Sequence, residues 1–144
     1  MSQFAIDRGN GVLLVKFEGS ITVESLIALD RELKSFIARE GIMPTVIDFT
    51  DITSVDVQIS TLVHRGKNRS LMPGQQRVFV ATESLLFGLL RVYGAYQDGR
   101  GERPPMIVRS LGDAFATLSL TDPKFEPIEN GFEQAGTSSP AAAC

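Results

Sequence analysis

Short apolar segments of β character alternate along this chain with longer amphipathic segments, and this alternation limits the fold more than any other feature. The five strand-like segments are residues 4–7, 12–18, 46–49, 77–81 and 106–108. Strands that alternate with helices favour a mainly parallel sheet, because right-handed helical crossovers join neighbouring parallel strands. The first two segments flank an Asn10-Gly11 turn, which predicts an antiparallel hairpin. We therefore predict an α/β fold with a mixed, mainly parallel five-stranded sheet.

Four helices are predicted between and after these strands. The first begins after Thr22, a good N-cap, and ends at Gly41, with apolar residues spaced three and four apart between them. The second begins near Ser54 or Asp56. The third and fourth follow the last two strands, which gives the order β-β-α-β-α-β-α-β-α.

Composition predicts one domain with a tail. The chain has 144 residues, of which 43% are hydrophobic and 22% are charged, as is ordinary for a globular protein that forms a core without disulfides or metals. We predict a single domain over residues 1–124. Residues 125–144 include a run of small and polar residues without periodicity, which indicates a flexible C-terminal tail.

Several classes of function are disfavoured by charge and residue content. A net charge of −3 argues against broad attraction to nucleic acid. One cysteine, Cys144, and one histidine, His64, cannot form a zinc cage or an internal disulfide. No apolar run approaches the roughly 20 residues that span a bilayer, and the N-terminus lacks the pattern of a signal peptide. We expect a cytoplasmic protein without nucleic-acid partner, membrane span, metal or cofactor.

The segment VIDFTDITSVDVQIS, residues 46–60, passes from an apolar strand through acidic and hydroxyl residues into a helix. We interpret Asp48 and Asp51 as strand-end and turn residues rather than as an acid–base pair. We interpret Thr53, Ser54 and Asp56 as caps of the second helix.

The same segment carries a resemblance to a family. The strand 46–49, followed by Thr50, Ile52 and Asp56, resembles the central motif of STAS domains, a group that includes the SpoIIAA-like anti-anti-sigma factors of bacteria. The element order agrees over residues 3–120, and the segment 77–115 is similar to a SpoIIAA-like branch of small bacterial proteins. The resemblance implies a binding or regulatory module that acts through protein–protein contacts.

The regulatory members of this family carry two serines and a glycine after the acidic residue, and a partner kinase phosphorylates the second serine. In this chain Val57 and Gln58 fall on the two serines, and Ile59 falls on the glycine. The resemblance therefore implies a module without the phosphorylatable serine. Ser54 and Ser60 are the alternative hydroxyls, although hydroxyls at helix starts are more often caps.

A hydrolase is a remote alternative. Asp56, Ser60 and His64 are four residues apart and would share one face of a helix. A nucleophilic serine needs a base in reach and a third group that orients the base. Because Ser60 stands between Asp56 and His64, the acid is poorly placed to orient the imidazole, and no GxSxG turn is present. We predict a solvated polar face and no catalytic residues.

The C-terminal end of the third helix and the loop after it are the best predicted place for binding. Two tyrosines close the helix, and a glycine-spaced loop then presents two arginines, which suits recognition by a loop on a rigid scaffold. An exposed connection with core-edge tyrosines is the alternative. The predicted binding residues here are Tyr93, Tyr96, Arg100 and Arg103. Two further predicted binding residues, Asp56 and Gln58, lie at the start of the second helix.

Two residue patterns near the second helix are also open to interpretation. The basic residues in 64–69 suit a phosphate or an acidic partner, or they complement the dipole at the helix end. Gly66 within this helix predicts close packing of a neighbouring element.

The broad apolar stripe of the third helix predicts a partner or a ligand. Phe87 lies off the line from Leu85 to Leu89, so we expect apolar surface for a second subunit and predict a homodimer with a regulatory protein partner. The alternative is a small apolar molecule or lipid in a pocket between the sheet and this helix, near Leu86, Leu90 and Tyr93.

Overall fold

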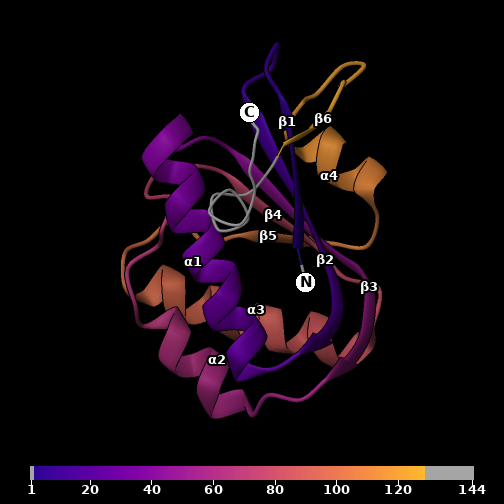
Figure 1. Cartoon of the computed structure of the whole chain (residues 1–144). Helices are drawn as coiled ribbons and strands as arrows, with labels where there is room; N and C mark the ends of the chain where they lie inside the picture. Colours follow the sequence, from indigo (N-terminus) through magenta and orange to yellow (C-terminus); the bar gives the residue numbers. More distant parts are fainter. Residues whose placement is uncertain (1, 129–144) are drawn as a thin grey trace, which may run out of the picture.

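The computed structural model describes residues 2–128, which form one six-stranded sheet and four helices (Figure 1). The strands stand in the order β5-β4-β3-β2-β1-β6. In chain order the elements are β1 (Ser2–Asp7), β2 (Val12–Ile21), α1 (Val23–Glu40), β3 (Thr45–Val55), α2 (Ile59–Gly66), β4 (Arg77–Val80), α3 (Ser84–Gly99), β5 (Met106–Val108), α4 (Leu111–Thr117) and β6 (Glu126–Ile128).

The sheet is mixed. Strands β2, β3, β4 and β5 pair in parallel, whereas β1 pairs antiparallel with β2 and with β6. The predicted hairpin is confirmed: Gly11 has a φ of 66°, and the Asp7 carboxylate accepts hydrogen bonds from the Asn10 backbone N–H (3.0 Å) and side-chain amide (2.7 Å). A positive φ is where glycine has the advantage over other residues.

The predicted number of five strands is wrong, because β6 adds a sixth. It pairs with β1 so that Phe4 lies opposite Ile128. The segment Glu126-Pro127-Ile128 belongs to the predicted tail. A proline is tolerated at the edge of a sheet, where its missing N–H breaks no ladder. The rest of the predicted tail, residues 129–144, lies outside the described residues.

Helices cover both faces of the sheet, because alternate residues of the central strands point to opposite sides. Val46, Val78 and Val80 pack with Ala114 of α4. On the opposite face, the strand residues Ile47, Phe49 and Phe79 belong to one core cluster with residues of α1 and α3, which include Leu29, Phe36 and Leu86. Figure 1 accordingly shows α4 on one side of the sheet and the three other helices on the other.

Strand β3 is longer than predicted. It continues beside β2 as far as the pairing of Ile21 with Val55, with one bulge between Asp48 and Asp51 and a second register shift between Ile52 and Ser54. Such a bulge interrupts the alternation of side chains, which explains why the sequence pattern ended the strand at residue 49. Asp48 and Asp51 therefore lie within the strand and not at its end.

The predicted caps of α2 are wrong for the same reason. Helix α2 begins at Ile59 after Gln58, whose side chain makes no capping hydrogen bond. The Ser54 hydroxyl instead lies 2.7 Å from that of Ser20 across the sheet, and the Asp56 backbone N–H donates to the Ile21 carbonyl at 2.8 Å. Extended pairing with β2 thus delays the helix by several residues.

The predicted caps of α1 are confirmed. The Thr22 hydroxyl accepts from the Ser25 backbone N–H at 3.0 Å, the Ser25 hydroxyl accepts from the Thr22 backbone N–H at 2.8 Å, and Gly41 ends the helix with a φ of 85°.

None of the helices in residues 2–128 is long and apolar enough to cross a membrane.

Candidate ligand-binding site

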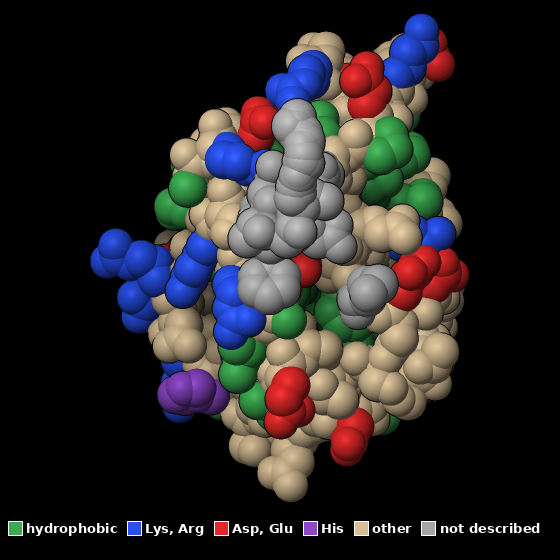
Figure 2. All heavy atoms as spheres, in the orientation of Figure 1, with side chains coloured by type: hydrophobic (Ala, Val, Ile, Leu, Met, Phe, Trp, Pro, Cys, Tyr) green, Lys and Arg blue, Asp and Glu red, His purple; other side chains and the backbone are tan. Residues whose placement is uncertain are grey.

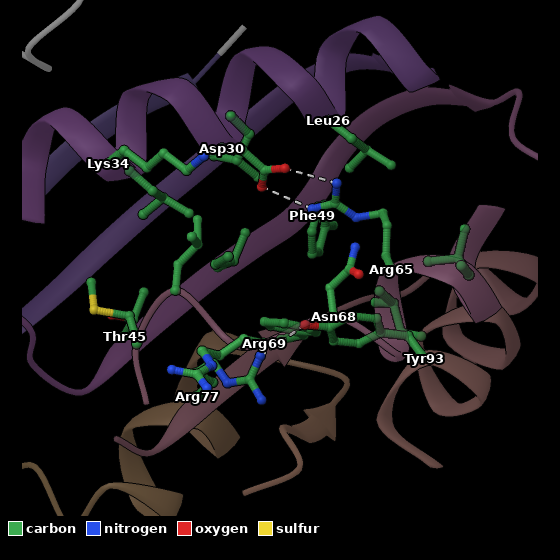
Figure 3. A pocket seen from close by; sticks show the side chains of 18 residues that line it. Leu26, Asp30, Lys34, Thr45, Phe49, Arg65, Asn68, Arg69, Arg77 and Tyr93 are labelled. Carbon is green, nitrogen blue, oxygen red and sulfur yellow. Dashed lines mark hydrogen bonds and ion pairs between the residues drawn. The ribbon is translucent and has the colours of Figure 1, made fainter. Parts of the chain in front are cut away.

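A cavity of about 290 Å³ lies between the sheet and helices α1, α2 and α3 (Figure 3). Its walls are mostly apolar, and its apolar lining includes Leu29, Leu33, Ile47, Phe49, Phe79 and Leu90. Interiors of proteins are normally close-packed, so an unfilled space of this size in the region of a core is a candidate binding site.

Close packing of α2 on α3 forms one side of the cavity. A Cβ atom added to Gly66 would lie 2.6 Å from the Tyr96 Cβ and 2.8 Å from the Tyr93 carbonyl oxygen, closer than real Cβ atoms approach their neighbours. This confirms the packing role predicted for Gly66. The Gln97 side-chain amide is fully buried and donates to the carbonyl oxygens of Gly66 and Asn68, both at 2.8 Å.

A charge pair joins this side to α1. The Arg65 guanidinium donates two hydrogen bonds of 2.9 Å to the two carboxylate oxygens of Asp30, and Figure 3 shows the pair across the space between α1 and α2. Burial of Arg65 opposes its charged form, but the hydrogen bonds and charge of Asp30 outweigh burial and raise the pKa of Arg65. The charge of Arg65 is therefore matched within the protein.

The guanidinium of Arg77 is hydrogen-bonded to neutral groups and not to a carboxylate. Arg77 opens β4 beside the cavity and is only 8% exposed. One terminal nitrogen donates to the Tyr93 hydroxyl at 2.9 Å, and the other donates to the Gln97 side-chain oxygen at 2.9 Å and to the Arg103 carbonyl oxygen at 2.7 Å. These acceptors are neutral, and no carboxylate in residues 2–128 forms an ion pair with Arg77.

The Nε atom of Arg77 has no hydrogen-bond partner, and it is the sole buried side-chain nitrogen or oxygen of the described residues in that condition. Leaving a buried donor unsatisfied costs about 1–3 kcal/mol, and more for a charged group.

Basic side chains outnumber acidic ones around the cavity. Lys34, Arg65, Arg69 and Arg77 line it, against Asp30 alone. In Figure 3, Asp30 and Lys34 come from α1 on one side, and Arg69, Arg77 and Tyr93 come from the opposite side. Figure 2 shows basic side chains gathered along the left of the visible face, over α1 and the connections beside it. The cavity thus combines an apolar interior with positive charge.

The structure places the predicted binding residues in three separate regions. Tyr93 lines the cavity, and Arg103 contributes its carbonyl oxygen to Arg77 while its side chain donates to the Gly74 carbonyl oxygen at 3.2 Å. Tyr96 and Arg100 lie outside the cavity, on a shallow groove of α3 beside Lys67, whose ammonium stands 5.6 Å from the Tyr96 ring centre.

The other two predicted binding residues, Asp56 and Gln58, lie between β3 and α2. Gln58 accepts a long hydrogen bond of 3.4 Å from the Ser60 hydroxyl. Asp56 precedes α2, so it does not share a helix face with Ser60 and His64 as the spacing predicted. Ser60 and His64 instead line a groove between α1 and α2.

Sequence patterns missed the two polar residues at the centre of the site. Hydrophobic patterning makes Arg77 the first residue of an apolar strand and places Gln97 in the loop after Tyr96. The usable signal was a charged residue opening the buried stretch Arg77–Val80, since arginine is almost never fully buried without a partner.

Asp48 and Asp51 do not act together. The Asp48 carboxylate accepts from the Thr50 backbone N–H at 2.9 Å, and the Asp51 carboxylate pairs with the Lys16 ammonium at 2.9 Å. No group of three or more His, Cys, Asp or Glu side chains in the described part of the chain is arranged to hold a metal ion.

Comparison with known proteins leaves the functional question to this geometry. No protein-family model matches the chain, and no curated protein sequence matches it.

Proposed function

We propose that this protein is a non-enzymatic binding module that holds a small apolar molecule in the cavity between the sheet and helices α1, α2 and α3. The observation that carries the proposal is a largely apolar pocket of about 290 Å³. A ligand that covers apolar walls removes their surface from water, which contributes roughly 25 cal/mol per Å². The volume is near the lower end of the roughly 300–1,000 Å³ of small-molecule sites, which favours a small ligand.

Filling the cavity with protein atoms tests this proposal. We expect native mass spectrometry or calorimetry to detect binding of a neutral probe, octan-1-ol, to the wild-type chain. Leu90→Phe places extra atoms on the cavity wall and is expected to weaken that binding. Leu85→Phe is the matched control, because Leu85 is 57% exposed on the same helix and does not line the cavity. Equal binding by all three chains would refute the proposal, and so would the absence of wild-type binding both to octan-1-ol and to charged probes of the same chain length.

We also propose the kinship with STAS domains and a regulatory protein partner as a second candidate function. Its support is the position of residues 46–49 on β3 at the middle of the sheet, in the element order that the resemblance implies. Three exposed apolar residues near the starts of α1 and α2 supply a contact surface: Val23, Ile27 and Ile59. A pull-down with wild-type chain and with Ile27→Glu separates the candidates, since loss of a captured protein with unchanged octan-1-ol binding supports a partner at this surface.

A homodimer through α3 is part of this second candidate. Leu85 and Tyr96 are exposed large hydrophobic residues of this helix, whereas the Phe87 ring is covered by the Arg109 guanidinium at 4.0 Å from the ring centre. Light scattering is expected to give twice the chain mass for the wild type and the chain mass for Leu85→Glu. A wild-type monomer would exclude the dimer.

A further inference from the structure

We infer that the ligand of the cavity is a small amphiphilic anion, an aliphatic or aromatic carboxylate, whose head group lies against the basic part of the lining, at Arg77 and Arg69. This inference rests on the proposed function, because it requires that the cavity binds a ligand. It adds the charge of the ligand and the position of its head group.

The first argument is the basic lining of the cavity. Lys34, Arg69 and Arg77 line it together with Arg65, whose charge Asp30 already compensates. A carboxylate forms shorter and stronger charge-assisted hydrogen bonds with guanidinium and ammonium donors than a neutral acceptor does.

The second argument is the balance of charge. Buried arginine side chains are normally paired, and removal of a charge from water is costly unless an opposite charge compensates. Asp30 is the one acidic residue lining the cavity, and Arg65 binds both of its oxygens. The protein therefore leaves Arg77 with neutral acceptors, and an anionic ligand would supply the missing charge.

The third argument is pre-organisation. Hydrogen bonds fix the Arg77 guanidinium at both terminal nitrogens, and Gln97, which accepts one of them, is itself anchored to α2 through Gly66 and Asn68. A donor held this way loses little freedom when it binds a ligand. Arg69 and Lys34 line the same cavity and add positive potential for an anion.

The apolar walls define the rest of the ligand. Leu29, Leu33, Phe49 and Phe79 offer no hydrogen-bonding groups from their side chains, so they favour a hydrocarbon body. The small volume favours a carboxylate over a bulkier dianionic phosphate, whose additional oxygens would need further donors.

The test compares probes that share an eight-carbon chain and differ in the head group. Calorimetry at neutral pH is run with octanoate, octan-1-ol, octylammonium and octyl phosphate. We expect octanoate to bind at least about tenfold more tightly than octan-1-ol, since a hydrogen bond to a charged group contributes about 1.5–3 kcal/mol. Octylammonium is expected not to bind.

A pair of variants locates the head group. Arg77→Met is expected to bring the affinity ratio of octanoate to octan-1-ol close to one. Arg91→Met, which removes the same charge from an exposed position of α3 away from the cavity, is expected to keep the wild-type ratio. Because Arg77 also supports the fold, circular dichroism accompanies each variant, and the wild-type ratio tests the charge of the ligand without any variant.

The outcomes separate this inference from the proposed function. Equal binding of octanoate and octan-1-ol would overturn the inference while the cavity remained a binding site. Tighter binding of octyl phosphate than of octanoate would overturn the carboxylate head group. An unchanged ratio in folded Arg77→Met would remove Arg77 as its site, and absence of binding by every probe would overturn both proposals.

Discussion

The two faces of the sheet are built from alternate residues of the same strands, yet they are packed differently. On the α4 face, small branched side chains such as Val46, Val78 and Val80 meet one short helix, and each is fully buried. On the opposite face, larger residues meet three helices and still leave a cavity of about 290 Å³. Larger side chains do not by themselves give a fuller core.

Helix placement accounts for the difference. On the face that contains the cavity, α2 packs closely on α3 at Gly66, and the Arg65–Asp30 ion pair joins α2 to α1. A row of rings forms the floor between the two sides, with 6.0 Å between the centres of Phe49 and Phe79 and 6.1 Å between Phe79 and Tyr93. The three helices on this face therefore border the cavity, whereas α4 packs directly against the other face of the sheet.

The largest expected effect compares two leucines of α3 that differ in what they touch. Leu86 is 2% exposed within the packed core, whereas Leu90 is 5% exposed and lines the cavity. Leu86→Ala is expected to lower the free energy of unfolding by about 3–5 kcal/mol and Leu90→Ala by about 2–3 kcal/mol, because part of Leu90 already faces an unfilled space. Urea denaturation measures both, and a larger loss for Leu90→Ala would mean that this wall is packed.

The next prediction concerns the closed contact between α2 and α3. Gly66→Ala forces a methyl group against Tyr93 and Tyr96, so we expect it to lower the free energy of unfolding by about 1–3 kcal/mol. Gly88→Ala is the control: it lies in α3 with no atom within 4 Å of the added Cβ, and alanine should stabilise it by about 0.5–1 kcal/mol. If both substitutions stabilise the protein, the two helices are not in close contact.

The third prediction tests the Arg65–Asp30 ion pair, which joins α2 to α1 on the face that contains the cavity. The side chains of Arg65 and Asp30 are 27% and 30% exposed, whereas those of Lys16 and Asp51 are 43% and 49% exposed. A double-mutant cycle with Arg65→Met and Asp30→Asn is expected to give a coupling near the upper end of about 0.2–1 kcal/mol, and the Lys16–Asp51 cycle a value near the lower end. Equal couplings would show that the bridge is no stronger than a surface pair.

Element type and order could be predicted from the sequence, because hydrophobic periodicity and caps are local. Thr22 and Gly41 bound α1 as expected, and Asn10-Gly11 forms the hairpin turn. Short or interrupted elements could not be predicted in the same way. The bulge in β3 and the proline of β6 both break the local pattern, and in each case pairing with a distant strand decides the structure.

The candidate site was predicted only in part. Tyr93 and Leu90 line the cavity as the apolar-pocket alternative placed them, whereas Leu86 is buried in the core beside it. Arg77 and Gln97 are 20 residues apart in the chain, and their hydrogen bond depends on how α3 crosses the start of β4. Local patterns hold no information about such a crossing.

The smallest expected effect concerns Asp7, at the edge of the sheet face that α4 covers. The Asp7 carboxylate accepts hydrogen bonds from Asn10 and from the Lys124 backbone N–H at 3.1 Å, next to Phe125, whose ring stacks on Phe115 of α4 at 5.6 Å between centres. The Asn10 side chain, with help from the backbone N–H groups, lowers the pKa of Asp7 from its ordinary 3.8. Asp7 thus helps to hold the segment that closes this face.

The sign of the pH dependence follows from that shift. Because the pKa of Asp7 is lower in the folded than in the unfolded protein, its stabilising contribution is complete above about 3.8 and is lost as the pH falls through the folded value. Asp7→Asn is expected to reduce stability at pH 7 and to flatten the loss of stability between neutral and acidic pH, as measured by urea denaturation at several pH values. An acid loss as steep in Asp7→Asn as in the wild type would assign it to other carboxylates, and the face that α4 covers would then not depend on this turn.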